Sequence, residues 1–223
     1  MRTRNSLLEL YKGDPHSKEF ADRIANSSGI KEVARNVVRH NEIRAETEGR
    51  HTSQSEKNLS GALLNIGVKV MFEPVCFFVP EINSLHRPDF FTNMYIDNRI
   101  VAIEVHGIEW LQRRRGYTAE QANRYVGKIS RVKARNPDIY FIFVSDMKRG
   151  KFESRFGLST SDFCSKYVHM PNAFAHPERV VRKFERIRNR DNAYIERDYK
   201  VWHSHVMQII QRELTGFAAL KRN

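Results

Sequence analysis

Apolar residues recur at two different spacings in the central part of this chain, and each spacing predicts a different element. Residues 51–67 and 117–136 carry apolar side chains three or four positions apart, which is typical of helices with one buried face. Residues 68–79 and 87–107 are rich in β-branched and aromatic residues, as expected of strands. Residues 138–146, DIYFIFVSD, are almost entirely apolar, which predicts a strand covered on both faces.

Both predicted helices carry end signals. Ser and Thr residues precede the first helix and Gly67 follows it, whereas Thr118 and Gln121 form a Thr-x-x-Gln capping box at the start of the second. The residues expected on the buried faces are Leu59, Leu63 and Ile66 in the first helix and Ala122, Val126, Ile129 and Val132 in the second.

The order helix, strand, hairpin, helix, strand predicts an α/β fold with a mixed central sheet flanked by helices. We assign this core to residues 53–146. Residues 1–52 look helical and polar, without a core-sized apolar face, and are interpreted as an N-terminal helical appendage. Residues 147–223 are interpreted as a basic, mainly helical extension that packs on the core.

The segment 87–107, RPDFFTNMYIDNRIVAIEVHG, reads as a hairpin whose turn is Asp97-Asn98. With that turn, Ile96 pairs with Arg99 and the register runs outward from there. An odd number of loop residues would move every side chain to the opposite face.

This register brings three residues with reactive side chains, Asp89, Glu104 and His106, to one face of the hairpin. The register places Asp89 opposite His106 and Glu104 opposite Phe91, and residues directly opposite or two apart share a face. Two ionised carboxylates at so short a distance repel each other. A divalent cation such as Mg²⁺, bound between them, offsets this repulsion. The alternative is a hairpin whose charged face simply meets water.

Glu56 lies on the apolar stripe of the first helix, three residues before Leu59 and seven before Leu63. An acidic residue at that position is aimed at the sheet. The alternative is a first-turn glutamate that is stabilised by the helix dipole.

A polar stripe borders the buried face of the second helix, and its members are Gln121, Arg124, Lys128, Arg131 and Arg135. Lys128 lies near the apolar edge of this stripe and is a candidate for neutralising a phosphate. The alternative is a basic face that is merely solvated.

The charge of the whole chain favours a polyanionic partner. Its 223 residues include 38 Lys and Arg against 26 Asp and Glu, a net charge of +12. DNA is the simplest partner of such a chain. No apolar run approaches the length of a membrane span and the N-terminus lacks a secretory signal, so we expect an intracellular, cytoplasmic protein.

The acidic residues and their order resemble the PD-(D/E)XK nuclease superfamily. That pattern is an acid on a helix, then Pro-Asp, then Glu-x-Lys on neighbouring strands; the matching residues are Glu56, Pro88-Asp89 and Glu104-Val105-His106. RPDFF followed by IVAIEVHG looks most like the branch related to very-short-patch repair endonucleases. The resemblance covers residues 53–146 and implies a restriction-endonuclease-like core.

The resemblance also implies a site. Asp89, Glu104 and the backbone carbonyl of Val105 would hold Mg²⁺, for which Mn²⁺ could substitute, and Glu56 would assist through water. His106 stands where the family has a lysine. Either His106 fills that role, or Lys128 fills it from the helix, or activity is lost.

The resulting hypothesis is a Mg²⁺-dependent DNA endonuclease. It could be structure-specific, like a Holliday-junction resolvase acting as a homodimer, or it could be a nicking enzyme. The residues expected to contact DNA are Arg113, Arg114, Arg115, Gln121, Arg124 and Arg131, although the first three could equally form a solvated loop. The alternative function is a catalytically inactive nucleic-acid-binding module on a nuclease fold.

Overall fold

A computed structural model describes residues 53–73, 75, 77–79, 81, 84–109, 111, 116–170 and 177–220. The N-terminal appendage expected for residues 1–52 lies outside the described residues, as do Arg113, Arg114 and Arg115. Within the described part of the chain, no helix is long and apolar enough to cross a membrane.

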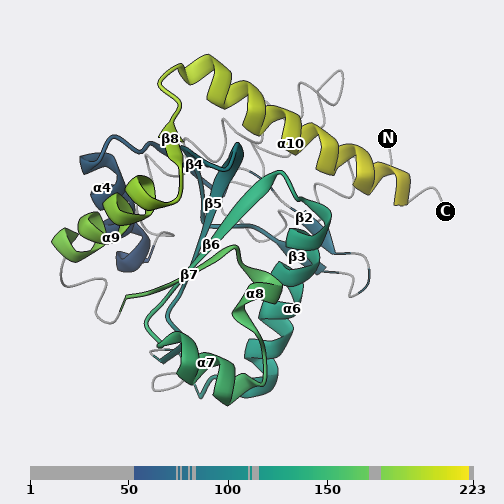
Figure 1. Ribbon diagram of the computed structural model, residues 1–223. Helices are drawn as coiled ribbons and strands as arrows, with labels where there is room; N and C mark the ends of the chain where they lie inside the picture. The colour runs from purple at the N-terminus through teal and green to yellow at the C-terminus, as the bar shows by residue number, and fades with distance from the viewer. Residues whose placement is uncertain are drawn as a thin grey trace.

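The centre of the fold is a mixed six-stranded sheet flanked by helices (Figure 1), which confirms the predicted fold class. Its strands are β1 (Val70–Phe72), β4 (Phe90–Ile96), β5 (Arg99–His106), β6 (Ile139–Ser145), β7 (Lys166–His169) and β8 (Ala193–Ile195). Their order is β1-β4-β5-β6-β7, with β8 also paired to β4. The β4–β5 hairpin is antiparallel, whereas β5, β6 and β7 run parallel. The last two strands of the sheet thus come from residues after 146.

The turn of the central hairpin is the predicted one. Ile96 pairs with Arg99, and both turn residues, Asp97 and Asn98, have positive φ angles of 50° and 60°. Positive φ at both central positions is the mark of a type I′ turn, whose twist suits a two-residue hairpin.

The register predicted further from the turn is wrong by two residues. Phe91 pairs with Ala102 instead of Glu104, because β4 has an irregularity between Phe91 and Tyr95. Continuing this register, Asp89 comes opposite Glu104. A shift of two keeps every side chain on its expected face. Extended to Asp89, which precedes β4 and lies outside the paired residues of the ladder, the register would set the two carboxylates on one face, directly across from each other.

Thr92 and Asn93 explain why β4 departs from a regular ladder. The Thr92 hydroxyl donates to the Val101 carbonyl at 3.2 Å and accepts from the Met94 N–H at 3.1 Å. The Asn93 side chain accepts from the Lys69 N–H at 2.7 Å and donates to the Glu196 carbonyl at 2.8 Å. Asn93 thus joins the segments that lead into β1 and out of β8 on the same edge of β4.

Helix α4 (Gln54–Asn65) and helix α9 (Pro177–Arg190) pack against each other and cover one face of the sheet (Figure 1). Leu59 and Leu63 of α4 and Phe184 of α9 are fully buried there. The predicted end of α4 is confirmed: Gly67 has φ +80° and donates to the Leu64 carbonyl.

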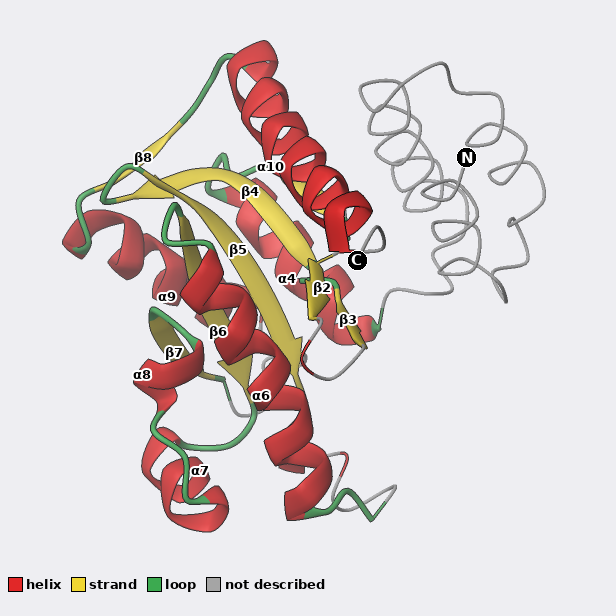
Figure 2. Cartoon of the chain, turned by 90° about the vertical axis from the view of Figure 1, so that its right-hand side faces the viewer, coloured by secondary structure: helices red, strands yellow, loops and turns green. Residues whose placement is uncertain are grey.

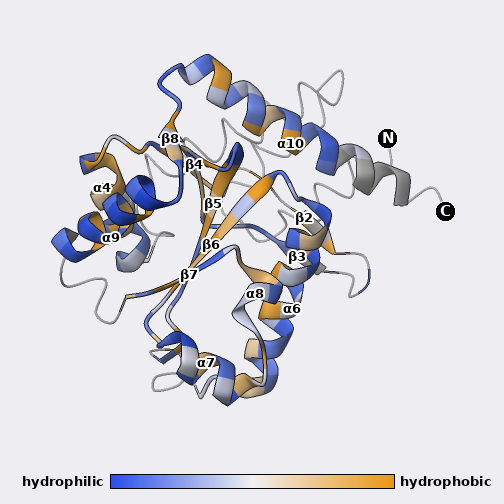
Figure 3. Cartoon of the chain, viewed as in Figure 1, coloured by the Kyte–Doolittle hydropathy of each residue, from blue (hydrophilic) through white to orange (hydrophobic). Residues whose placement is uncertain are grey.

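The opposite face is covered by helix α6 (Ala119–Arg135) and helix α10 (Tyr199–Leu220), as Figure 2 shows. The predicted buried face of α6 and its Thr118–Gln121 capping box are both confirmed. A separate two-stranded sheet of β2 (Phe77–Val79) and β3 (Ser84–His86) packs between these helices and the main sheet. In Figure 3 the central strands β5 and β6 are largely hydrophobic, whereas α9 is largely hydrophilic.

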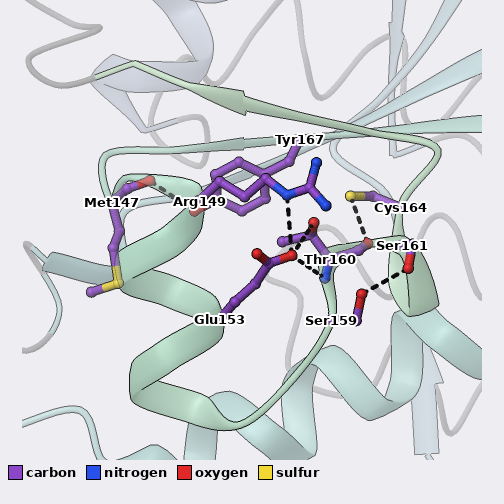
Figure 4. Close-up of polar contacts among 8 residues, drawn as sticks. All are labelled: Met147, Arg149, Glu153, Ser159, Thr160, Ser161, Cys164 and Tyr167. Atoms are coloured by element: carbon purple, nitrogen blue, oxygen red, sulfur yellow. Dashed lines mark hydrogen bonds and ion pairs between the residues drawn. The ribbon is translucent and has the colours of Figure 1, made fainter.

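Two short helices, α7 (Arg149–Phe156) and α8 (Thr160–Phe163), connect β6 to β7. Glu153 joins them (Figure 4): one of its oxygens accepts hydrogen bonds from the N–H and hydroxyl of Thr160 and from Arg149. Phe152 and Phe163 pack beneath these polar contacts, so the connection is anchored to the sheet.

Candidate functional site

Asp89 and Glu104 meet at the end of the β4–β5 hairpin that lies away from its turn. Asp89 immediately precedes β4, and its Oδ2 accepts a 2.6 Å hydrogen bond from the N–H of Val105. Glu104 lies in β5, and only 5% of its surface is exposed. The short bond to Val105 fixes the Asp89 carboxylate beside the strand position next to Glu104.

Both carboxyl groups are held in an environment that disfavours their charge. Burial raises the pKa of Asp89 well above its ordinary value, and the charge of Glu56 raises it further, although the hydrogen bond from Val105 opposes the change. Burial also raises the pKa of Glu104, followed by the charges of Asp89, Glu73 and Glu56. Four acidic side chains thus influence one small region, and a cation there would relieve their repulsion.

Glu56 performs a local structural task. It is the third helical residue of α4, where its carboxylate accepts from the Ser53 N–H at 3.2 Å and from the Ser53 hydroxyl at 2.6 Å. The Glu56 N–H in turn donates to the Ser53 hydroxyl oxygen at 3.2 Å, which completes a capping box. Glu56 also acts electrostatically on Asp89, and burial raises its own pKa. Glu56 therefore caps α4, and its charge also acts on the sheet acid Asp89.

His106 packs against two aromatic side chains, Tyr125 of α6 and Tyr117, which lies just before that helix. Its ring stacks on Tyr125 with the centroids 4.1 Å apart, and its Nε2 lies 3.2 Å from the Tyr117 hydroxyl. Burial lowers the pKa of His106 to about 4, so the imidazole is neutral at physiological pH. A neutral imidazole in these contacts is a poor replacement for the charged lysine of the family pattern.

His86 belongs to the site although sequence reasoning did not select it. This residue ends β3 and is 5% exposed, and its Nε2 lies 3.6 Å from Oε2 of Glu104. Burial lowers the pKa of His86 to about 3, with further contributions from Lys128 and His106. Its position three residues before Asp89 was the only sequence signal, because β3 is too short to show a hydrophobic period.

Glu73 is the second residue that the sequence did not point to. It follows β1, has a φ of 40°, and donates its N–H to the Asp89 carbonyl at 2.9 Å. Its carboxylate lies 3.5 Å from the Arg87 guanidinium. Glu73 acts electrostatically on Glu104, so it belongs to the acidic surroundings of the site.

The residues of α6 that were expected to contact DNA differ in their surroundings. Gln121 is occupied by the capping box, Arg124 pairs with Glu120 at 3.0 Å, and Arg131 donates to the Gly127 carbonyl at 2.9 Å. All three remain exposed. Lys128 is partly buried, and its charge acts on His86.

The donors near Asp89 and Glu104 suit a divalent cation. Carboxylates are the ligands that Mg²⁺ and Mn²⁺ prefer, and Oε2 of Glu104 has no hydrogen-bond partner within the described residues. The described part of the chain holds no group of three His, Cys, Asp or Glu side chains arranged to bind a metal.

An open groove of about 720 Å³ lies at the turn end of the hairpin, between β8 and α10. Tyr95 lines it and stacks on both Tyr194 and His205. Because Tyr95 is adjacent to the turn and Asp89 lies at the far end of β4, this groove is separate from the acidic site.

Comparisons of the chain with known protein-family models, curated proteins and solved structures find no match.

Proposed function

We propose that this protein is a metal-dependent DNA endonuclease of the PD-(D/E)XK type. The observation that carries the proposal is the Asp89–Glu104 pair, which two neighbouring strands bring together across an antiparallel hairpin. The pair lies at a site where burial and the charges of neighbouring acidic residues raise both pKa values. Such strongly perturbed groups cluster at functional sites.

In this proposal, Asp89, Glu104 and the Val105 carbonyl hold Mg²⁺ or Mn²⁺, and Glu56 assists through water. The bound ion would supply positive charge to offset the negative charge that develops on the phosphate during hydrolysis. The hydrogen bond from Val105 to Asp89 orients one carboxylate before any ion arrives. This preorganisation reduces the cost of assembling the site.

Lys128 is the better candidate for the role of the missing lysine. It acts electrostatically on His86, whereas His106 is neutral and packed on Tyr125. A fixed cation next to the phosphate would stabilise the charged transition state. His106 instead supports the wall of the site.

The DNA would lie along the exposed basic stripe of α6. Arg124 and Arg131 are available for phosphate contacts because surface pairs such as Arg124–Glu120 are weak and exchange readily. Arg113, Arg114 and Arg115 directly follow the site in sequence and would contact the backbone flanking the cut. Junction resolution by a homodimer and nicking of a duplex both remain within this proposal.

The test is a cleavage assay on supercoiled, linear, single-stranded and branched DNA with Mg²⁺ or Mn²⁺. We expect the wild type to cut at least one of these substrates and Asp89→Asn to cut none. Glu185→Gln, which removes a carboxylate from α9, is the matched control and should cut like the wild type. DNA binding that is unchanged in Asp89→Asn would show that only the chemistry is lost.

A second candidate function is a nucleic-acid-binding module without catalysis. The engagement of His106 with Tyr117 and Tyr125 favours it, since the family's lysine has no equivalent at that position. This function would be established if the wild type and Asp89→Asn bind DNA equally well and neither cleaves it. The total charge of +12 fits both candidates and does not separate them.

A further inference from the structure

Two polar atoms face each other in the interior without forming a hydrogen bond. Nε2 of His86 and Oε2 of Glu104 lie 3.6 Å apart, and their side chains are 4% and 6% exposed. Neither atom has a hydrogen-bond partner within the described part of the chain. A separation of 3.6 Å is too long for a hydrogen bond between nitrogen and oxygen. Buried polar atoms are normally paired, so a missing third group is implied.

The surroundings favour a cation over a water molecule as that group. The charges of Asp89, Glu73 and Glu56 all act on Glu104. A water could satisfy hydrogen bonds but would leave this excess of negative charge uncompensated. Lys128, which acts on His86, and Arg87, 3.5 Å from Glu73, add two positive charges, which are fewer than the four acidic groups.

The spacing also suits a shared metal ion. Ligand atoms that each lie about 2.1 Å from one ion are roughly 3 to 3.5 Å apart, close to the separation observed here. Imidazole nitrogen and carboxylate oxygen commonly bind the same transition-metal ion. These two atoms need only a small adjustment to do so, whereas a third side-chain ligand would have to move further, since the described residues form no ready group of three.

We propose that His86 and Glu104 bind the same divalent cation, so that the metal site contains an imidazole nitrogen as well as carboxylates. This proposal rests on the proposed nuclease function and adds a ligand to its metal site. Transition-metal ions, Mn²⁺ among them, accept a mixed set of imidazole and carboxylate ligands and bind nitrogen more readily than Mg²⁺, which prefers oxygen alone. The site therefore binds Mn²⁺ more tightly than Mg²⁺. His86 reaches it from β3, which packs against α6.

Electron paramagnetic resonance with Mn²⁺ tests the proposal independently of DNA cleavage. Pulsed spectra of the wild-type protein with bound Mn²⁺ should show modulation from a directly bonded ¹⁴N nucleus. His86→Gln should lose this modulation and bind Mn²⁺ on the order of tenfold more weakly or worse. His106→Gln is the matched control, because it removes a neighbouring imidazole and should retain the nitrogen signal.

Isotope labelling protects the test against a variant that fails to fold. Wild-type protein carrying ¹⁵N-histidine should exchange the ¹⁴N modulation for that of ¹⁵N, with no substitution at all. His86→Asp provides a second variant, which should still bind Mn²⁺ but without the nitrogen modulation.

The outcomes separate this inference from the nuclease proposal. Wild-type protein that cuts DNA and binds Mn²⁺ without nitrogen modulation overturns the His86 ligand and leaves the nuclease function standing. Nitrogen modulation that His86→Gln abolishes, in a protein that cuts no DNA, supports the ligand and removes the nuclease function. Modulation that persists in His86→Gln and disappears in His106→Gln assigns the nitrogen to His106 and overturns the proposal.

Discussion

Oδ2 of Asp89 accepts a 2.6 Å hydrogen bond from the backbone N–H of Val105, the residue between Glu104 and His106. This bond ties the start of β4 to the end of β5 and holds one buried carboxylate beside another. The arrangement costs folding free energy because both pKa values are raised. Functional sites commonly retain such a cost, and removing it stabilises the fold while abolishing activity.

Asp89→Asn should therefore be more stable than the wild type. An asparagine oxygen can still accept from Val105, whereas the negative charge that repels Glu104 is gone. We expect a gain of about 1 kcal/mol in the free energy of unfolding at neutral pH, together with complete loss of cleavage. Urea unfolding measures the gain. Asp89→Ala also loses the hydrogen bond from Val105, so it should not show this gain in stability. Equal destabilisation by both substitutions would contradict repulsion between Asp89 and Glu104.

The contribution of Asp89 and Glu104 to the stability of the metal-free protein should fall as pH rises. Asp89 and Glu104 have raised pKa values in the folded state, so their contribution is greatest below the pKa of the unfolded chain and is lost as pH rises through the folded values. Between about pH 5 and 8, Mn²⁺ should raise the melting temperature by an increasing amount. Thermal melts with and without the ion measure this, and a pH-independent Mn²⁺ effect would argue against carboxylate ligands.

Lys128 and His106 should give different defects. Lys128→Gln is expected to reduce the cleavage rate roughly 100-fold with little loss of stability, because it removes only a charge next to the phosphate. His106→Gln is expected to cost about 1 to 3 kcal/mol of stability, since it loses the stack on Tyr125 and the contact with Tyr117. Cleavage rates and urea unfolding of both variants decide the assignment. A large rate loss confined to the folded His106→Gln protein would reverse it.

Glu153 should stabilise the connection between α7 and α8 in a pH-dependent way. Hydrogen bonds from the Thr160 backbone and hydroxyl and from Arg149 lower its pKa to about 2. Because the pKa of Glu153 is lower in the folded protein than in the unfolded chain, its contribution to stability is present above the unfolded pKa. This contribution is lost as pH falls toward the pKa of the folded protein. Glu153→Gln should thus be less stable than the wild type at neutral pH, with a difference that shrinks below about pH 4.5. Urea midpoints measured over a pH series test this expectation.

Asn93→Ala should be strongly destabilising. The Asn93 amide is buried and satisfies the Lys69 N–H and the Glu196 carbonyl, which would both lose their partner. We expect a loss of about 2 to 4 kcal/mol in the free energy of unfolding. Gln208→Ala, at an exposed position of α10, is the control and should stay close to the wild type. A small loss in Asn93→Ala would mean that water replaces the amide.

Much of the fold was predictable because local chemistry specified it. The capping box at Thr118 and Gln121, the glycine after α4 and the Asp97-Asn98 turn each involve residues that are neighbours in sequence. Their geometry depends on nearby backbone, so the pattern alone was sufficient. The same holds for the buried run of β6, whose apolar residues could not remain in water.

The register of β4 was not predictable in the same way. The regular ladder is broken by Thr92 bonding to Val101 and by Asn93 bonding to Lys69 and Glu196, and Glu196 is more than 100 residues away. No local pattern reveals a partner at that distance. The candidate site kept its face only because the shift is an even number of residues.

The sequence by itself determined the helices and the hairpin turn, because periodicity and capping act over a few residues. Only the tertiary structure brought His86 to Glu104, turned His106 against Tyr125 and joined β7 and β8 to the sheet. These contacts depend on how distant segments pack, and burial is a property of the assembled core. The chemical character of the site was therefore decided by packing, although its two central carboxylates were already visible in the sequence.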